Sequence, residues 1–338
     1  PVSSQRTPTR RQLLIGAGAV VGAGSLGAAG LLRWRAGNGS GAAPEAPSKV
    51  PGTADAELDA LAGAVMSGGP GKDGIPPIDR PRFVPARDVD YLENDAPVFA
   101  LDHRGEFKAY PQSILVWHEI VNDTVAGVPL TVTYCPLTGT AVGFASPPGE
   151  SWTFGTTGML VNSNLLMYDR QTESEWPQIL GTAISGPRKG TALQPVPLVW
   201  TTWRAWRAAH PDSPVLSPET GALRSYGRDP YGSYTPPSGY YVEPGTYFPV
   251  RHSDDRLGDK DVVVGIRSGP DYLAIRKRRI FEDRQMQVEV GGITWRAQWD
   301  DDLAAATVVH SGTGEPADFL DAMWFAWFAY YPQTRLLV

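Results

Sequence analysis

The chain has 338 residues, of which 42% are hydrophobic and 20% charged, so it can bury the core of an ordinary globular protein. Its formal net charge is −6 at pH 7, which excludes the basic surface expected of a nucleic-acid-binding protein. Its single cysteine, Cys135, excludes an internal disulfide bond.

The first 35 residues have the features of an export signal. Arg10 and Arg11 form a twin-arginine pair, and residues 13–32 follow as an apolar run rich in Gly and Ala. This pattern resembles a signal for the twin-arginine route, which carries proteins that are already folded. The run is also long enough to span a bilayer, so an uncleaved anchor is the alternative to a cleaved signal. We therefore expect an exported, extracytoplasmic protein that contacts the membrane only through this segment.

The rest of the chain is expected to contain a linker and one domain. Residues 36–54 are dominated by Gly, Ala, Pro and Ser, which is typical of a flexible linker. Residues 55–338 are expected to form a single globular domain. The 11 Trp, 37 Gly and 31 Pro of the chain indicate short strands and turns rather than long helices. The predicted fold class is α+β, with mainly short antiparallel strands and a few helices.

The predicted elements follow one another closely along this domain. In its first part they are a hairpin at 97–110, a helix that starts at Pro111 and ends at Asn122-Asp123, a hairpin at 128–144, and a helix at 203–210. Beyond an ordered loop rich in Gly, Pro and Tyr, at 217–260, they are strands at 261–266, 272–275, 286–290 and 293–299, and a closing helix at 319–331.

Parts of the sequence echo one another. The matching pairs are 98–110 with 263–275, 127–133 with 291–297, and 203–213 with 324–334. The last pair has tryptophans three residues apart, which lie on one helix face, and a proline that ends each helix. We interpret the echo as two degenerate repeats, at about 80–216 and 260–338; chance recurrence is the alternative. In this alignment Cys135 falls near Trp299 and Asp300, so only the first half keeps a reactive site.

Cys135 and His118 are the first candidates for chemistry. Cys135 ends a predicted strand at a Pro/Gly turn, and His118 lies near the end of the preceding helix. A helix that packs back on the following strand would bring the imidazole and the thiol together. Such a pair can form a thiolate nucleophile or bind a metal, and its soft donors make copper our first choice. The alternatives are a buried cysteine that acts as a small hydrophobe and a histidine that stabilises a helix end.

Asp169 and Arg170 are the second pair of candidate site residues. They open the polar stretch that reaches Trp176, in which hydroxyl side chains occupy alternate positions. A carboxylate, a guanidinium and hydroxyls on one strand face could line a polar pocket. The alternative is a hydrogen-bonded turn that contains a local ion pair.

Several motifs in fixed order resemble those of a domain-of-unknown-function family of bacterial and archaeal proteins, from about residue 79 to the C-terminus. The matching motifs are Tyr134-Cys135-Pro136-Leu137-Thr138-Gly139-Thr140, His118-Glu119-Ile120-Val121-Asn122-Asp123 and Asp169-Arg170-x-Thr172-x-Ser174-x-Trp176. The resemblance implies no established activity, but it singles out His118, Cys135, Asp169 and Arg170 as site residues. This chain has Thr138 where some relatives have a second cysteine, which argues against a dithiol mechanism.

These observations leave three hypotheses for the function. The leading one is an exported protein with a metal-binding or redox site at Cys135 and His118, with copper as the metal. The second is a cofactor-free Cys–His enzyme, with Asp169 and Arg170 as further catalytic candidates. The third is a non-catalytic extracytoplasmic module whose Trp and Tyr side chains form a binding surface for sugar or cell-wall material. The expected partner is accordingly a metal or a small molecule, and not a nucleic acid.

Overall fold

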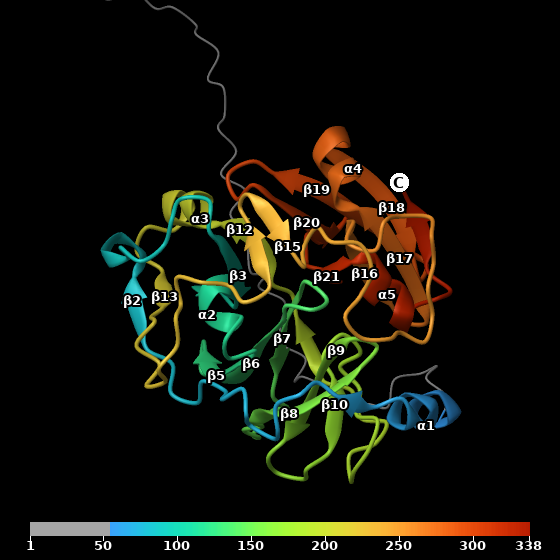
Figure 1. Cartoon of the computed structure of the whole chain (residues 1–338). Coiled ribbons are helices and arrows are strands. Elements are labelled where there is room, and N and C mark those ends of the chain that lie inside the picture. Colours follow the sequence, from blue (N-terminus) through green and yellow to red (C-terminus); the bar gives the residue numbers. More distant parts are fainter. Residues whose placement is uncertain (1–54) are drawn as a thin grey trace, which may run out of the picture. The chain divides into compact units, whose positions relative to one another are not determined.

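The computed structural model describes residues 55–338 of the chain (Figure 1). Its regular structure is mostly antiparallel strand with few helices, as the sequence predicts. The predicted export signal and linker, residues 1–54, lie outside the described residues. Within the part of the chain that is described, no helix is both long and apolar enough to cross a membrane.

Two sets of elements follow each other along the chain in the same order (Figure 1). The first set is β3 (Pro97–His103), β4 (Glu106–Pro111), α2 (Gln112–Leu115), β5 (Ile120–Val125), β6 (Val128–Cys135), β7 (Thr140–Ala145), β12 (Val199–Thr202), α3 (Trp203–Ala209) and β13 (Pro214–Leu216). The second set is β16 (Val262–Ser268), β17 (Asp271–Arg276), α4 (Lys277–Asp283), β18 (Gln285–Val290), β19 (Ile293–Asp300), β20 (Ala305–His310), β21 (Asp318–Met323), α5 (Trp324–Tyr330) and β22 (Arg335–Leu337).

The two sets have the same spacing and the same strand pairing. Each strand from β16 to β20 begins and ends 165 residues after its counterpart from β3 to β7. Helix α5 and strand β22 begin and end 121 residues after α3 and β13. The first set forms the sheets β12-β3-β4-β13 and β7-β6-β5, and the second forms β21-β16-β17-β22 and β20-β19-β18. The last strand of the larger sheet is parallel to its neighbour in both sets.

The central strands β3 and β16 explain why each larger sheet forms where it does. Val98 to Leu101 and Val263 to Ile266 are continuous runs of buried residues rather than alternating patterns. A strand covered on both faces has this pattern, because every side chain then points into a core.

The two sets contact each other reciprocally. Strand β21 of the second set packs against β7 of the first, and β12 of the first packs against β20 of the second. On one side Met323 N donates a hydrogen bond to Thr138 O over 3.0 Å, and on the counterpart side Thr201 Oγ1 donates to Leu303 O. Counterpart strands therefore exchange roles, as they do in a twofold-symmetric dimer.

The remaining elements belong to only one set or lie between the two. The N-terminal part contains α1 (Asp55–Gly63), β1 (Met66–Ser67), β2 (Phe83–Pro85) and the short 3₁₀ helix η1 (Ala86–Asp88). Between β7 and β12 the first set carries β8 (Phe154–Val161), β9 (Asn164–Asp169), β10 (Glu175–Pro177) and β11 (Gln194–Val196). Strand β11 extends the β7-β6-β5 sheet, and the others form the sheet β1-β8-β9-β10. The segment 217–260, which joins the sets, contains the small hairpin β14 (Gly232–Tyr234) and β15 (Pro237–Gly239).

Three sequence predictions need correction. The predicted helix at 111–123 ends at Leu115, and Ile120 to Val125 form β5, because these β-branched residues pair with β6. The closing helix starts at Trp324 rather than at 319, since residues 318–323 pair with β16 as β21. The match of 127–133 with 291–297 is displaced by one residue, because Val128 of β6 corresponds to Ile293 of β19.

Gly265 tests the packing of the second set. A Cβ at this position would lie 2.2 Å from Cζ3 of Trp327, which is fully buried. We expect Gly265→Ala to lower the free energy of unfolding by about 1–3 kcal/mol, since the core must move to admit a methyl group. Gly258→Ala is the matched control, because a Cβ there comes no closer than 3.4 Å to any neighbour. Equal unfolding midpoints for the two variants in urea would contradict this packing.

Candidate functional site

Cys135 lies deep in the core, at the end of β6. It pairs with Thr140, the first residue of β7, and its side chain is 0% exposed. Its Sγ is 4.0 Å from the carbonyl oxygen of Ser163. Burial raises the pKa of the Cys135 thiol to about 11, and the charge of Glu119 adds to the shift. The thiol is therefore protonated at neutral pH, which is the opposite of what a nucleophile or a metal ligand needs.

His118 is held by protein groups at both ring nitrogens. Nδ1 is 2.7 Å from the carbonyl oxygen of Pro76, and Nε2 is 2.7 Å from the hydroxyl oxygen of Tyr226. Because a carbonyl can only accept, Nδ1 carries the proton and donates, and the lone pair of Nε2 accepts from Tyr226. Burial lowers the pKa of His118, so the ring is neutral. No hydrogen bond joins His118 to Cys135 in the described part of the chain.

The backbone at Glu119 accounts for the separate contacts of His118 and Cys135. The register of β5 with β6 pairs Ile120 with Thr133, so a regular continuation would place His118 opposite Cys135. The ladder stops there because Glu119 has φ +58°, in the left-handed region. Across the described residues, no group of three or more His, Cys, Asp and Glu side chains is placed to hold a metal ion. The structure therefore gives no support to the predicted copper site.

Glu119 is a candidate that the sequence analysis did not single out. Its side chain is buried, with 7% of the residue exposed, and it forms no hydrogen bond or ion pair with any described residue. Burial raises the pKa of its carboxyl group to about 8. A buried, unpaired carboxyl group beside a thiol is unusual in a protein core. The available signal was a charged residue directly before Ile120 and Val121, two β-branched residues that begin a strand.

Asp169 and Arg170 point into different environments. Asp169 is fully buried and accepts hydrogen bonds from Thr172, from Trp176 Nε1 at 3.0 Å and from Arg188 Nη1 at 2.6 Å. Arg170 is partly exposed and pairs with Asp79 at 2.7 Å. Asp169 thus sits in a hydrogen-bonded turn with a local ion pair, which matches the alternative interpretation of this motif. Among the described residues, no hydrogen bond or ion pair of Asp169 or Arg170 leads to Cys135.

A buried polar network lies beside the Cys135 turn. Gln178 Nε2 donates to Thr133 Oγ1 over 3.1 Å, and Thr140 Oγ1 donates to Gln178 Oε1 over 2.7 Å. Asn164 Nδ2 completes the network through Gln178 Oε1 at 2.9 Å and Thr138 Oγ1 at 3.1 Å. Because its members satisfy one another, this network fixes the β6–β7 turn. The hydroxyl of Thr138 accepts a hydrogen bond from Asn164. This side chain therefore has a structural role at the position where some relatives have a second cysteine.

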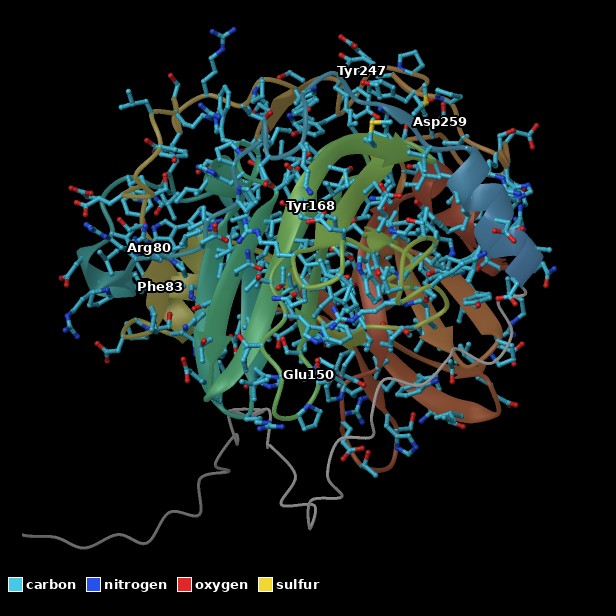
Figure 2. The ribbon with its side chains drawn as sticks, turned by 90° about the horizontal axis from the view of Figure 1, so that it is seen from below. Arg80, Phe83, Glu150, Tyr168, Tyr247 and Asp259 are labelled. Carbon is cyan, nitrogen blue, oxygen red and sulfur yellow. The ribbon has the colours of Figure 1, made fainter. Side chains whose placement is uncertain are left out.

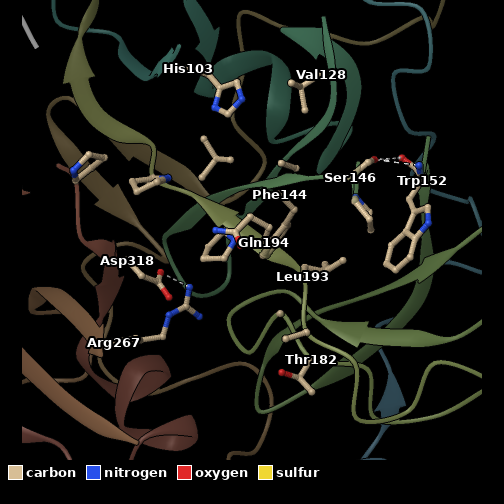
Figure 3. Close-up of a pocket in the computed structure, with 18 of the residues that line it drawn as sticks. His103, Val128, Phe144, Ser146, Trp152, Thr182, Leu193, Gln194, Arg267 and Asp318 are labelled. Atoms are coloured by element: carbon tan, nitrogen blue, oxygen red, sulfur yellow. Dashed lines mark hydrogen bonds and ion pairs between the residues drawn. The ribbon is translucent and has the colours of Figure 1, made fainter. Parts of the chain in front are cut away.

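A second candidate site lies elsewhere, where the two sets meet. We call it the inter-set cleft; it has a volume of about 990 Å³ (Figure 3). Its first-set wall includes His103 at the end of β3, Phe144 of β7 and Gln194 of β11, and its second-set wall includes Arg267 of β16 and Tyr272 of β17. The sequence analysis missed this cleft, because its two walls come from segments that are far apart in the chain.

Two residues that line the inter-set cleft each carry a buried side-chain nitrogen without a partner among the described residues: His103 Nε2 and Arg267 Nε. The other guanidinium nitrogens of Arg267 are engaged, with Asp318 at 2.7 Å and with the carbonyl oxygen of Ile179 at 2.6 Å. Burial lowers the pKa of His103, and the charge of Arg104 adds to this effect. The cleft therefore offers a neutral imidazole and a fixed N–H donor between apolar walls.

A protein-family model matches residues 72–334 of the chain. The chain belongs to this family, Protein of unknown function (DUF3179). Membership confirms the resemblance to a domain-of-unknown-function family that the sequence showed. The match covers all of the first set and the second set up to β22. No match was found among curated proteins or among solved structures. The family therefore carries no activity over to this chain, and the function has to be argued from the sites themselves.

The variant Glu119→Gln tests how ionisation of the buried Glu119 side chain affects the free energy of unfolding, because glutamine has a similar shape but cannot ionise. The carboxyl group has an ordinary pKa of 4.5 in the unfolded chain and a pKa of about 8 in the folded one. Between these values the folded state keeps a proton that the unfolded state has lost. The contribution of this carboxyl group to the free energy of unfolding is therefore fully present below the pKa that the group has in the unfolded chain. It decreases as the pH rises to about 8, by roughly 1.4 kcal/mol per pH unit at most.

The measurement is urea unfolding of wild type and Glu119→Gln at several pH values across that window. We expect the variant to gain stability relative to wild type as pH rises, because glutamine cannot ionise. Glu315→Gln, at an exposed position, is the matched control and should show no such trend. A stability difference between wild type and Glu119→Gln that does not change with pH would contradict the raised pKa.

The Cys135 thiol should be unreactive in the native protein. A thiol with a pKa of about 11 has little thiolate near neutral pH, and its burial blocks access as well. We expect iodoacetamide to label native protein roughly 100-fold more slowly than protein unfolded in urea at the same pH. Mass spectrometry of the intact chain measures both rates. Fast labelling of the folded protein would show that Cys135 is exposed and activated.

Proposed function

We propose that this protein is a binding protein that holds a small organic ligand in the inter-set cleft. The observation that carries the proposal is that two residues lining this cavity, His103 and Arg267, each have an unpartnered buried nitrogen, His103 Nε2 and Arg267 Nε. Buried polar atoms normally have a partner, so two orphans in one cavity mark a place for ligand atoms. The volume of about 990 Å³ lies within the range of small-molecule sites.

The chemistry of the walls defines the kind of ligand. Phe144, Leu193 and Tyr272 offer apolar or aromatic surface, which suits a ligand with an apolar body. Arg267 Nε can only donate a hydrogen bond, whereas a neutral His103 can donate or accept at Nε2. The charge of Arg267 is already balanced by Asp318, so a full negative charge on the ligand is not required. We therefore propose a ligand with an apolar body and at least one carbonyl or hydroxyl oxygen.

The metal, redox and Cys–His enzyme hypotheses are weaker than this proposal. Each needs His118 and Cys135 to share a substrate or an ion. The hydrogen bonds of His118 to Pro76 and Tyr226 would first have to break, and the buried thiol would have to ionise. Non-catalytic ligand binding requires neither change. It corresponds to the third hypothesis from the sequence, with the cleft as its binding surface.

We also propose that the protein is exported and works outside the cytoplasm. Support comes from the sequence, in which Arg10 and Arg11 precede the apolar run at 13–32. Export by the twin-arginine route suits a binding protein that must be folded before it leaves the cell. Whether the segment is cleaved or kept as an anchor decides if the protein is soluble or held at the membrane.

We further propose that the two sets arose by duplication of an ancestral unit that formed a dimer. The constant offset of 165 residues over five strands supports this origin, as do the reciprocal contacts of β7 with β21 and of β12 with β20. Side-chain contacts agree: Trp206 Nε1 donates to Ser213 Oγ over 2.9 Å, and Trp327 Nε1 donates to Thr334 Oγ1 over 3.0 Å. On this view the inter-set cleft is the former subunit boundary.

Gln194→Trp tests the binding proposal. Gln194 is exposed on β11 and lies at the inter-set cleft, so an indole there should fill the cavity without disturbing the core (Figure 3). A library of small oxygen-containing aromatic and aliphatic compounds would be screened against wild type by ligand-observed NMR. We expect hits whose dissociation constants rise at least about tenfold in Gln194→Trp, because the ligand and the indole compete for the same space.

Gln285→Trp is the matched control, because Gln285 is also exposed on a strand but does not line the cleft. It should bind every hit as tightly as wild type does. Circular dichroism and urea unfolding would check that both variants fold. Hits that bind Gln194→Trp and wild type equally would place the binding site elsewhere and overturn the proposal, and so would a library without any hit.

A further inference from the structure

The lysines of the described residues fall into two groups. Four of them pair with a carboxylate: Lys72 with Glu173, Lys108 with Asp123, Lys189 with Asp59 and Lys277 with Asp321. The fifth, Lys260, has a buried Nζ atom without a hydrogen-bond partner in the described part of the chain. Lysines are rarely buried unless they are paired, so this side chain requires an explanation.

Aromatic rings surround the amine of Lys260. Its Nζ lies 3.0 Å from the centroid of the Tyr240 ring and 5.6 Å from that of Phe325. Ring faces attract an ammonium ion, but they replace only part of the water that it loses. Burial consequently lowers the pKa of Lys260 to about 8, although the charges of Asp259 and Glu243 act in the opposite direction. A substantial fraction of this amine is therefore neutral near physiological pH.

Lys260 also lines a cavity, which we call the Lys260 cavity. It has a volume of about 1260 Å³ and is separate from the inter-set cleft, with which it shares no lining residue. It lies along the segments 241–244 and 253–261; Asp259, next to Lys260 in the chain, is labelled in Figure 2. The side chain of Lys260 forms part of the cavity wall while its Nζ is buried against Tyr240, so rotation of this long side chain would bring the amine to a ligand in the cavity.

We propose that Lys260 is a nucleophilic amine that binds neutral or cationic aldehydes and ketones as a Schiff base in this cavity. The nitrogen lone pair attacks the carbonyl carbon, and the two amine hydrogens leave with the carbonyl oxygen as water. The product is an imine, with a C=N bond in place of C=O, so the step needs no oxidant or reductant. Asp259 and Glu243 are the nearby carboxylates that can pass an amine proton on to the departing oxygen.

The charges on the cavity walls set the preferred class of carbonyl compound. Five carboxylates and three basic side chains line the cavity: Glu243, Asp254, Asp255, Asp259, Asp261, Arg256, Lys260 and Arg276. Both arginines are already paired, Arg256 with Asp254 and Arg276 with Asp261. A negatively charged aldehyde would meet uncompensated carboxylates, whereas a neutral or cationic one would not. This site is independent of the ligand proposed for the inter-set cleft.

The test is reductive alkylation of the folded, full-length protein with glycolaldehyde, a neutral probe, and cyanoborohydride to trap the imine. Peptide mass spectrometry gives the rate at each lysine. We expect Lys260 to react at least tenfold faster than Lys72 or Lys189 near neutral pH, and faster with glycolaldehyde than with anionic glyoxylate. Its rate should level off above about pH 8, while the rates of the other lysines continue to rise. A Lys260 rate no higher than theirs would overturn the proposal.

Charge variants separate a reactive role from a merely structural one. Asp259→Asn and Glu243→Gln each remove a charge that favours the ammonium form, so the rate at Lys260 should rise severalfold below pH 7. Asp255→Asn removes an equal charge from the same cavity wall without being among the groups that act on Lys260, and it should leave the rate unchanged. Unfolding curves would verify that each variant is folded. If the alkylation rate at Lys260 is the same in all three variants, the proposed role of the amine is contradicted. The contact with Tyr240 would then be the only role left for Lys260.

Discussion

The reciprocal contact of β7 with β21 and of β12 with β20 is the constraint on which the rest of the structure depends. Neither set of elements completes its core alone: one hydrophobic cluster joins Phe144 of the first set to Trp324 of the second, and another joins Trp206 to Val264. Burying these side chains on both sides of one boundary fixes the two sets together. Where the strand contacts end, the turn after β3 and the end of β16 leave the inter-set cleft, which is therefore a product of the same packing.

The two sets place different residues at corresponding positions, and their surroundings decide what those residues can do. Glu119 corresponds to Arg284, and both have a left-handed backbone, with φ +58° and +65°. Arg284 is exposed and pairs with Asp301, whereas Glu119 is buried without a partner. Cys135 similarly corresponds to Asp300 of β19. The backbone geometry is shared, so the raised pKa of Glu119 comes from what covers it and not from the turn that presents it.

The sequence was informative where the chemistry is local. The hairpin of β6 and β7 and the helix α3 follow from alternation, a Pro/Gly turn and a cap at Thr202, and they were predicted. The helix expected through His118 was not found, because Ile120 and Val121 favour a strand and pair with β6. The hydrogen-bonded turn around Asp169 was predicted only as an alternative. Its ion-pair partner Arg188 was not predicted, because it lies 19 residues further along the chain. The inter-set cleft could not be predicted, because it depends on how two distant hairpins meet.

The polar groups that stabilise the fold are distinct from those that remain available to bind a ligand. The residues of the Cys135 turn satisfy one another, whereas the inter-set cleft and the Lys260 cavity retain polar atoms without partners among the described residues. The most direct test of the central claim is a crystal structure of the protein with a compound selected by binding. The account predicts that the compound lies in the inter-set cleft, within hydrogen-bond distance of His103 Nε2 and Arg267 Nε. A compound bound at the Cys135 turn, with the cleft empty, would contradict it.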